Sequence, residues 1–282
     1  MDLPAERYRS LRSELAAHHE QSLAAVERLL DEIDPPVVRR LTEQLAFAPS
    51  DALPKRKRRP KPEPSFLAAH TYRGHAPGGG DHAAIIEFAT CVTEWFDILD
   101  DVVDGDVKTG AEPEALIVTQ VLSALATRRV HAFGDEAVVF WTDRSFQLYA
   151  TQFARRESEP DAETYAAILR KEGTLFGFLT GIAALVAGAD DEAVEHAAKM
   201  GRAFYAFEHL LIDAENHHVE NDAWNAWRLM STPTFRTQVE KFRGEVNAAA
   251  SALPDEHARS IRDLTAVDVE AVIESARSDM SS

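Results

Sequence analysis

The chain has 282 residues, and 45% of them are hydrophobic, which is enough to bury one substantial core. Its formal net charge of −17 at pH 7 excludes general nucleic-acid binding, because that function requires a basic surface. Cys91 is the only cysteine, which excludes an intrachain disulfide and a zinc site built from cysteines.

The charged residues also indicate an environment. Only seven of the 30 basic residues are lysines, while 47 residues are acidic. Excess acid with scarce lysine suggests a halophilic protein, because high salt screens the repulsion between so many like charges. Residues 1–30 have the pattern of a charged amphipathic helix, and the apolar stretch Thr174–Gly188 is too short to cross a bilayer. We therefore expect a cytoplasmic protein.

Apolar residues recur at helical spacing along nearly the whole chain, and β-branched runs between turn residues are absent. The predicted fold class is therefore all-α. Proline and glycine mark the breaks between helices. The predicted helices span residues 4–32, 36–47, 64–73, 81–104, 113–131, 134–156, 161–187, 190–220, 233–252 and 255–279. No internal repeat and no linker between domains is found, so residues 1–282 are predicted to form one helical domain.

Five carboxylates gather at the end of the helix predicted over 81–104, in the segment DILDDVVDGD at residues 97–106. On a helix, Asp100 and Asp104 lie one turn apart on one face, with Asp101 beside them. Carboxylates this close repel one another. Mg²⁺ removes that penalty and keeps coordination positions for water and substrate phosphates. The alternative is a solvated helix end before a glycine turn.

Two further sequence patterns indicate an anion-binding segment and a close helix contact. KRKRRP at 55–60 is the only basic cluster, and its guanidinium groups could bind diphosphate through paired hydrogen bonds. A solvated loop is the alternative there, as a surface ion pair is for Lys171. Gly173, Gly177 and Gly181 recur every four residues, which lets another helix or an apolar chain approach the backbone.

The segment HAAIIEFATCVTEWFDILDDVVDGD at 82–106 resembles the first aspartate-rich motif, DDxxD, of the trans-isoprenyl diphosphate synthases, also called the polyprenyl synthetase family. Three more segments follow in the family's order. KRKRRP at 55–60 is similar to its GKRxRP segment, KEGTLFGFLTG at 171–181 to its KTxxL segment, and GRAFYAFEHLLID at 201–213 to its second aspartate-rich block. Together these landmarks span roughly residues 50–220.

The resemblance implies a single-domain helical bundle of the class I isoprenoid synthase type, with a central apolar cavity. It implies a prenyltransferase that condenses an allylic diphosphate with isopentenyl diphosphate after Mg²⁺-assisted ionisation. Two or three Mg²⁺ ions are expected with diphosphate bound. The expected assembly is a homodimer, or a heterodimer with a related synthase.

The resemblance also assigns roles by position. The Mg²⁺ ligands would be Asp100, Asp101, Asp104 and Glu208. The diphosphate-binding residues would be Arg56, Arg59, Lys108 and Lys171, of which Lys171 is also the candidate catalytic residue. The substrate pocket would contain Trp95, Phe96, Phe204 and Tyr205. The two aromatic residues before the first motif would favour a short product, and core packing is their alternative role.

The second aspartate-rich motif is eroded. Where the family has DDxxD, this chain has EHLLI at 208–212, in which only Glu208 keeps a carboxylate in register. Thr93 stands where the family usually has His or Gln, and Tyr205 replaces a Gln. The Arg-Arg-Gly segment that follows the first motif has its counterpart one residue early, at Lys108. The losses fall on the homoallylic substrate site and the third metal ion.

The same predicted helix offers other ligands. Asp213, Asn216 and Glu220 keep an i, i+3, i+7 spacing, a loose echo of the second metal motif of class I terpene cyclases. His209 and His217 flank Asp213 at four-residue steps and could bind a transition metal. A polar helix face is the alternative for both sets.

Three functions therefore remain open from the sequence. The first is an active prenyltransferase that makes a linear isoprenyl diphosphate. The second is a catalytically impaired relative that pairs with an active synthase and regulates it. The third is a terpene cyclase-like enzyme that uses one allylic diphosphate, which would explain why the allylic side survives while the homoallylic side decays.

Overall fold

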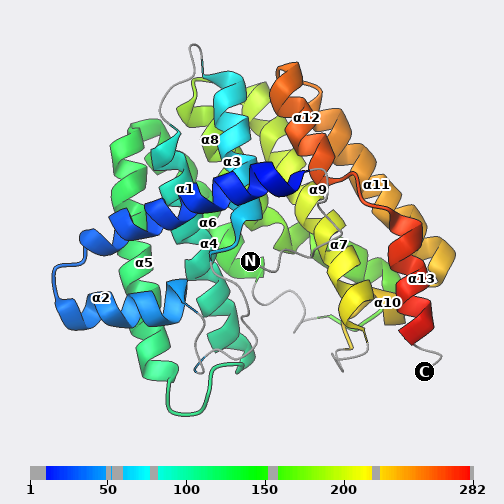
Figure 1. Cartoon of the computed structure of the whole chain (residues 1–282), viewed down its shortest axis with the longest axis horizontal. Helices are drawn as coiled ribbons and strands as arrows, with labels where there is room; N and C mark the ends of the chain where they lie inside the picture. The colour runs from blue at the N-terminus through cyan, green and yellow to red at the C-terminus, as the bar shows by residue number, and fades with distance from the viewer. Residues whose placement is uncertain are drawn as a thin grey trace. The chain divides into compact units, whose positions relative to one another are not determined.

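The structure is a computed structural model, and it describes residues 11–48, 52, 60–76, 82–151, 158–217 and 223–279. In this part of the chain all regular structure is helical and no strand occurs (Figure 1). The prediction of an all-α fold is confirmed. None of the described helices is long and apolar enough to span a membrane.

The chain divides into two compact units. The amino-terminal unit comprises Ser13–Thr142 and Val186–Gly188, and the carboxy-terminal unit comprises Met1–Arg12, Asp143–Leu185 and Ala189–Ser282. That residues 1–282 make one domain stays a prediction.

The amino-terminal unit is built around one buried helix. Its elements are α1 (Arg12–Asp31), α2 (Pro36–Thr42), the π-helical turn η2 (Glu43–Phe47), α3 (Pro62–His75), α4 (Ala83–Asp104), α5 (Glu112–Phe133) and the start of α6 (Asp135–Thr151). α4 packs against both α3 and α5, and every residue from Ile85 to Phe96 is buried. Because all of its faces are covered, α4 is apolar along most of its length rather than amphipathic.

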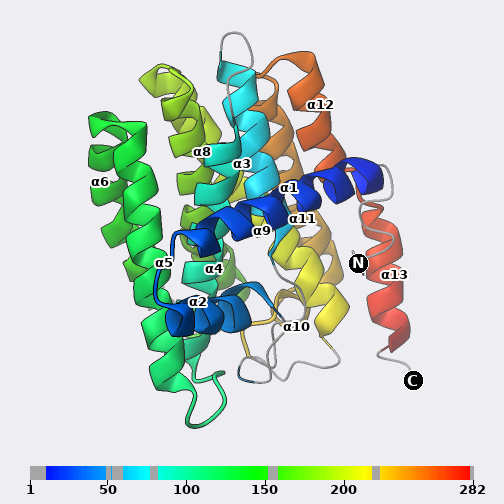
Figure 2. The same cartoon turned by 60° about the vertical axis from the view of Figure 1, so that its left-hand side comes forward.

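α1 crosses α3 at a steep angle (Figure 2). At the crossing, His18 Nε2 lies 2.8 Å from Ser65 Oγ, and the His18 ring meets the edge of Phe66 with 5.4 Å between ring centres. Burial lowers the pKa of His18 to about 3, so the imidazole stays neutral at physiological pH.

One arginine ties three helices of this unit together. Arg129 of α5 has a side chain only 14% exposed, and it binds Glu87 of α4 and Glu32 at the end of α1. Arg28 of α1 also pairs with Glu87. The hydrogen bond from Arg129 lowers the pKa of Glu32, which favours the charged form of that carboxyl.

The carboxy-terminal unit surrounds a second long helix. It holds the rest of α6, then α7 (Ala162–Glu172), α8 (Thr174–Val186), α9 (Asp191–Asn216), α10 (Ala226–Leu229), α11 (Thr232–Ala250), α12 (Asp255–Leu264) and α13 (Val269–Asp279). α9 packs against α7, α10, α11 and α13, and α11 runs beside it in both views (Figures 1 and 2). The aromatic residues Tyr165, Phe207, Phe235 and Phe242 are fully or almost fully buried in one cluster.

Helix starts in this unit follow the sequence signals closely. Asp161, directly after Pro160, accepts hydrogen bonds at 2.9 Å from the backbone N–H groups of Thr164 and Glu163. These hydrogen bonds lower the pKa of the Asp161 carboxyl, and the bond from Thr164 contributes most. Asp190 caps α9 in the same way.

The glycine stripe lies where α8 passes α9. A Cβ atom added at Gly173 would lie 2.7 Å from the carbonyl oxygen of Arg202, and Gly177 is equally crowded. From the other side, a Cβ at Gly201 of α9 would lie 2.3 Å from the Phe176 carbonyl oxygen. The two backbones therefore touch, which only glycine permits. The predicted single helix here is wrong at one point, because it breaks at Gly173 into α7 and α8.

The last predicted helix, over 255–279, is also two helices. Asp268 accepts a hydrogen bond from the backbone N–H of Ala271 at 3.1 Å and so starts α13 as a new helix. The four-residue helix α10 was not predicted at all. Asn225 begins it, by accepting a hydrogen bond from the Trp227 N–H at 3.0 Å.

We predict that Gly201→Ala destabilises the protein by about 2 kcal/mol, because overpacking a tight helix contact costs on that order. The matched control is Gly244→Ala in α11, where an added Cβ meets nothing within 4 Å. That change should be neutral or stabilising by about 0.5–1 kcal/mol, since alanine favours a helix. Urea unfolding in molar KCl measures both variants. Equal midpoints would contradict the backbone contact between α8 and α9.

Candidate metal and diphosphate site

The aspartate segment stands where buried α4 reaches the surface. The helix is buried as far as Ile98, whereas Asp100 and Asp104 are exposed and Asp101 is half-buried. An unpaired carboxylate is costly to bury, so the change from apolar to acidic residues fixes where the helix emerges. Two exposed carboxylates one turn apart are thereby presented on the helix end.

A glycine ends the helix immediately after these residues. Gly105 has φ of 76°, a left-handed conformation that side chains disfavour, and its N–H donates to the carbonyl of Val102 at 3.3 Å. The N–H of Asp106 donates to the carbonyl of Asp101 at 2.8 Å. Asp106 therefore lies beyond the helix and off the face of Asp100 and Asp104.

Lys61, which sequence reasoning missed, connects the basic segment to α4. Its Nζ lies 2.5 Å from Asp97 Oδ2, and its backbone N–H donates to Glu94 Oε1 at 3.2 Å. Glu94 is fully buried. No local sequence pattern indicates this contact, because Lys61 and Glu94 lie 33 residues apart in the sequence.

Lys61 directly follows the basic segment of residues 55–60 in the sequence. Arg56 and Arg59 themselves lie outside the described residues, but they precede Lys61 by only a few positions. The chain that leaves them is attached to α4 one turn before Asp101. Asp97 thus forms an ion pair with Lys61.

Lys108 follows α4 in the same unit. Its backbone N–H donates to the carbonyl of Ala52 at 2.9 Å, and its side chain is exposed. The loop after the first motif is therefore pinned by its backbone, which leaves the Lys108 ammonium accessible to an anion. Its predicted role in diphosphate binding stays a prediction.

The aspartates at the end of α4 fit Mg²⁺ better than they fit a metal ion whose ligands all come from the protein. In the part of the chain that the structure describes, no three His, Cys, Asp or Glu side chains come close enough to hold a metal ion. Mg²⁺ needs no such cage, because it commonly binds one or two carboxylates and completes its shell with water and substrate phosphates. Asp100 and Asp104 would hold it, with Asp101 adjacent.

The two aromatic residues before the motif are core residues of the amino-terminal unit. Trp95 and Phe96 are each 4% exposed, with ring centres 4.8 Å apart. Trp95 also stacks on Trp141 of α6 at 5.7 Å. Core packing, the alternative given for them above, is thus observed, and their role in a substrate pocket stays a prediction.

In the carboxy-terminal unit, Lys171 lies in the last turn of α7. Its side chain is exposed, and no described residue forms an ion pair with it. The surface pair considered from the sequence is therefore not formed within the described residues. A lysine presented in this way can bind an anion, which is the predicted role.

The predicted pocket residues of α9 differ in burial. Phe204 is fully buried and packs on Phe176 with 6.2 Å between ring centres. Tyr205 is half-buried, and its hydroxyl donates to Glu172 Oε2 at 3.4 Å. Glu208, the only carboxylate kept in the second motif, is half-buried one turn later. Nothing in this geometry tests its role as a metal ligand.

Asp213 has a structural use. Its Oδ2 accepts hydrogen bonds from the buried Tyr165 hydroxyl and, at 2.7 Å, from the Ala226 N–H. Asn225 also donates to the Asp213 carbonyl at 3.0 Å. The carboxylate thus joins α9 to α7 and α10. Asn216 is half-buried at the end of α9.

The transition-metal set on this helix, His209, Asp213 and His217, is not assembled among the described residues. His209 lies against the Tyr205 ring, with 4.1 Å between ring centres, and His217 Nδ1 lies 2.7 Å from the Ala214 carbonyl oxygen. The transition-metal site considered from the sequence therefore has no support among the described residues. Glu220 lies outside those residues, so the terpene cyclase-like set is only partly described.

The sequence matches no protein-family model and no curated protein. The structure, however, is similar to solved synthases. A geranylgeranyl pyrophosphate synthase from Corynebacterium glutamicum is 16% identical with a TM-score of 0.68, and the match covers 94% of each chain. A geranyltranstransferase from Methanosarcina mazei is 11% identical with a TM-score of 0.70, over 91% of this chain and 97% of that one.

A deletion mutant of the heterotetrameric geranyl pyrophosphate synthase of mint is 12% identical, with a TM-score of 0.66, over 90% of this chain and all of that one. The C. glutamicum enzyme has also been solved with calcium and isoprenyl diphosphate. At such low identity these likenesses show the fold. The chain has the all-α fold of the isoprenyl diphosphate synthases across about nine-tenths of its length.

We predict that Asp104→Asn weakens Mg²⁺-dependent binding of inorganic diphosphate about tenfold or more, since each tenfold loss corresponds to about 1.4 kcal/mol. A neutral amide is a poorer Mg²⁺ ligand than a carboxylate. Isothermal titration calorimetry with and without Mg²⁺ measures the effect.

Asp106→Asn is the matched control, because it removes the same charge from beyond the helix end. Its affinity should stay within about twofold of the unchanged protein. Equal losses in the two variants would show that only overall charge matters and that α4 holds no metal site.

Proposed function

We propose that the protein is a prenyltransferase that condenses an allylic diphosphate with isopentenyl diphosphate. The observation that carries this proposal is the aspartate segment at the exposed end of buried α4. Lys61, which directly follows the basic segment of residues 55–60 in the sequence, is paired with Asp97 of the same helix. The aspartate segment stands in a fold shared with solved synthases. Because the likeness extends over 90–94% of the chain, we keep the prediction of one domain over residues 1–282.

The proposed role of the acidic end is to bind the diphosphate through Mg²⁺. The ion, when bound, supplies Lewis-acid stabilisation of the leaving diphosphate. The C. glutamicum enzyme was solved with calcium and isoprenyl diphosphate, which supports the use of a divalent ion in binding the diphosphate. Asp100 and Asp104 orient the diphosphate, and Asp101, half-buried beside them, completes the acidic face.

The proposed role of the basic residues is to accept negative charge as the allylic carbon–oxygen bond breaks. In this proposal the positive charge is supplied by the residues predicted to bind diphosphate, Arg56, Arg59, Lys108 and Lys171. Fixed cations stabilise a developing diphosphate anion without the reorganisation that water requires. Asp97 forms an ion pair with Lys61 and is not proposed as a Mg²⁺ ligand.

Aromatic side chains before the aspartate motif are proposed to limit the length of the product. Trp95 and Phe96 form a rigid apolar wall one turn before the motif, braced by Trp141. Such a wall would shield the allylic cation from water and stop chain growth early. We therefore propose a short-chain product, with Phe204 and Tyr205 as further pocket residues.

A second function has an observation in its favour. Helix α6 exposes three large apolar side chains along one face, Val139, Phe146 and Tyr149, and Phe146 is 74% exposed. A partner subunit would cover such a face. Together with the eroded second motif, this supports a regulatory subunit that pairs with an active synthase, as well as a homodimer. The mint enzyme, described as heterotetrameric, offers a parallel.

The test is to incubate the purified protein with radiolabelled geranyl diphosphate and Mg²⁺ in molar KCl, with and without isopentenyl diphosphate. We expect a longer diphosphate only when isopentenyl diphosphate is present, and none after Asp104→Asn. Hydrocarbon formed without isopentenyl diphosphate would instead identify a cyclase. If the unchanged protein forms neither product, condensation is contradicted, and co-purification of a related synthase then tests the regulatory function.

A further inference from the structure

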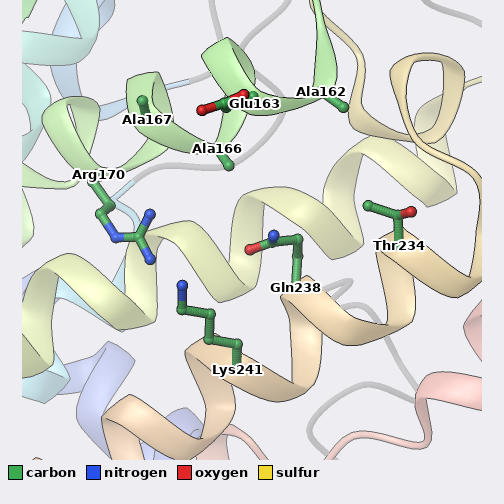
Figure 3. A pocket seen from close by; sticks show the side chains of 8 residues that line it. All are labelled: Ala162, Glu163, Ala166, Ala167, Arg170, Thr234, Gln238 and Lys241. Carbon is green, nitrogen blue, oxygen red and sulfur yellow. The ribbon is translucent and has the colours of Figure 1, made fainter.

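A groove lies between α7 and α11 of the carboxy-terminal unit, with a volume of about 460 Å³ (Figure 3). α7 lines it with residues at steps of four, Ala162, Ala166 and Arg170. α11 lines it with Thr234, Gln238 and Lys241. Both sets follow helical spacing, so each helix turns one continuous face to the groove.

Two cations meet at one end of this groove. Figure 3 shows the guanidinium of Arg170 and the ammonium of Lys241 pointing toward each other from the two helices. Arg170 is fixed by the Phe242 ring, whose centre lies 4.9 Å from Cζ, and its Nη2 lies 3.6 Å from Glu245 Oε1. Lys241 forms no ion pair or hydrogen bond with any described residue. Converging like charges repel, and a bound anion removes that repulsion.

Hydrogen-bond acceptors line the groove beside the cations. Gln238, one turn before Lys241, lines the groove, and its Oε1 has no donor among the described residues. This oxygen is turned away from solvent, and rotation of the side-chain amide would present it to a ligand in the groove. Such an acceptor costs free energy until a donor reaches it. Glu163 of α7 places a carboxylate on the same groove. A ligand that fits both carries hydroxyl groups.

We propose that this groove binds a small hydroxylated phosphate monoester, of the class of sugar and polyol phosphates. The phosphate lies between Arg170 and Lys241, where a planar guanidinium fork and a compact ammonium both favour it. Hydroxyl groups donate to Gln238 Oε1 and to Glu163, and the carbon skeleton contacts the methyl groups of the α7 alanines. The Glu163 carboxylate disfavours a second anionic group, which selects a monoester over a diphosphate.

This site is independent of the proposed prenyl chemistry. None of its residues is assigned to Mg²⁺, allylic diphosphate or the substrate pocket, and its occupant needs no metal. Binding measured in EDTA therefore reports the groove alone. The proposal stands or falls whether or not the protein condenses isoprenyl units.

The test is an NMR titration of the isotope-labelled full chain with glycerol 3-phosphate in EDTA. We expect saturable shifts in the unchanged protein and a loss of about tenfold in affinity for Lys241→Ala, the size expected for one charge-assisted contact. The matched control is Lys199→Ala, which removes an exposed lysine from α9 and should leave the affinity unchanged. No saturable binding, or equal affinity in the two variants, overturns the site.

The hydroxyl contacts are tested by a second ligand and a second variant. Methyl phosphate carries the same dianion without hydroxyl groups, so it should bind more weakly than glycerol 3-phosphate. Gln238→Leu keeps the packing volume and removes the acceptor, which should abolish most of that difference. Equal binding of the two esters by the unchanged protein overturns the assigned ligand class.

Discussion

The structure depends on one constraint: α4 must be buried along most of its length and still present its last two turns to solvent. Apolar residues up to Ile98 meet the first requirement, and the carboxylates of Asp100 and Asp104 meet the second, because charged groups are costly to remove from water. Gly105 then ends the helix with a left-handed residue, which stops the acidic face at that point. The buried part of α4 therefore fixes the position of the carboxylates at the end of the helix. A rigid, packed helix is a better support for ligands than a loop.

Much of this arrangement could be predicted from the local sequence. Most of the features that could not be predicted depend on contacts between residues distant in the sequence. The Gly105 turn and the Asp161 cap are signals carried by neighbouring residues, and both helix ends follow them. The break at Gly173 arises from contact with another helix, so the pattern of that segment alone does not show it. Lys61 was missed for the same reason, since its partners on α4 are distant in sequence. The cap at Asp268 was a local signal that helical periodicity on both sides concealed.

The two units differ in how far they keep the chemistry that the resemblance implies. The amino-terminal unit keeps the acidic face at the end of α4. In the carboxy-terminal unit, α9 uses Asp213 to hold Tyr165 and the start of α10, so that carboxylate serves packing. Glu208 is the remaining acidic residue of the second motif. An enzyme of this kind would ionise an allylic diphosphate with fewer carboxylates than the two motifs of the resemblance contain, and that ionisation is the first step of the proposed reaction.

The most direct measurement is therefore positional isotope exchange in an allylic diphosphate labelled with ¹⁸O at the bridging carbon–oxygen position. If the bond ionises reversibly, the label spreads to the non-bridging oxygens of the same phosphate, whether or not condensation follows. The account predicts that the unchanged protein scrambles the label in the presence of Mg²⁺ and that Asp104→Asn does not. A label that stays in the bridging position, with no product formed, would contradict it.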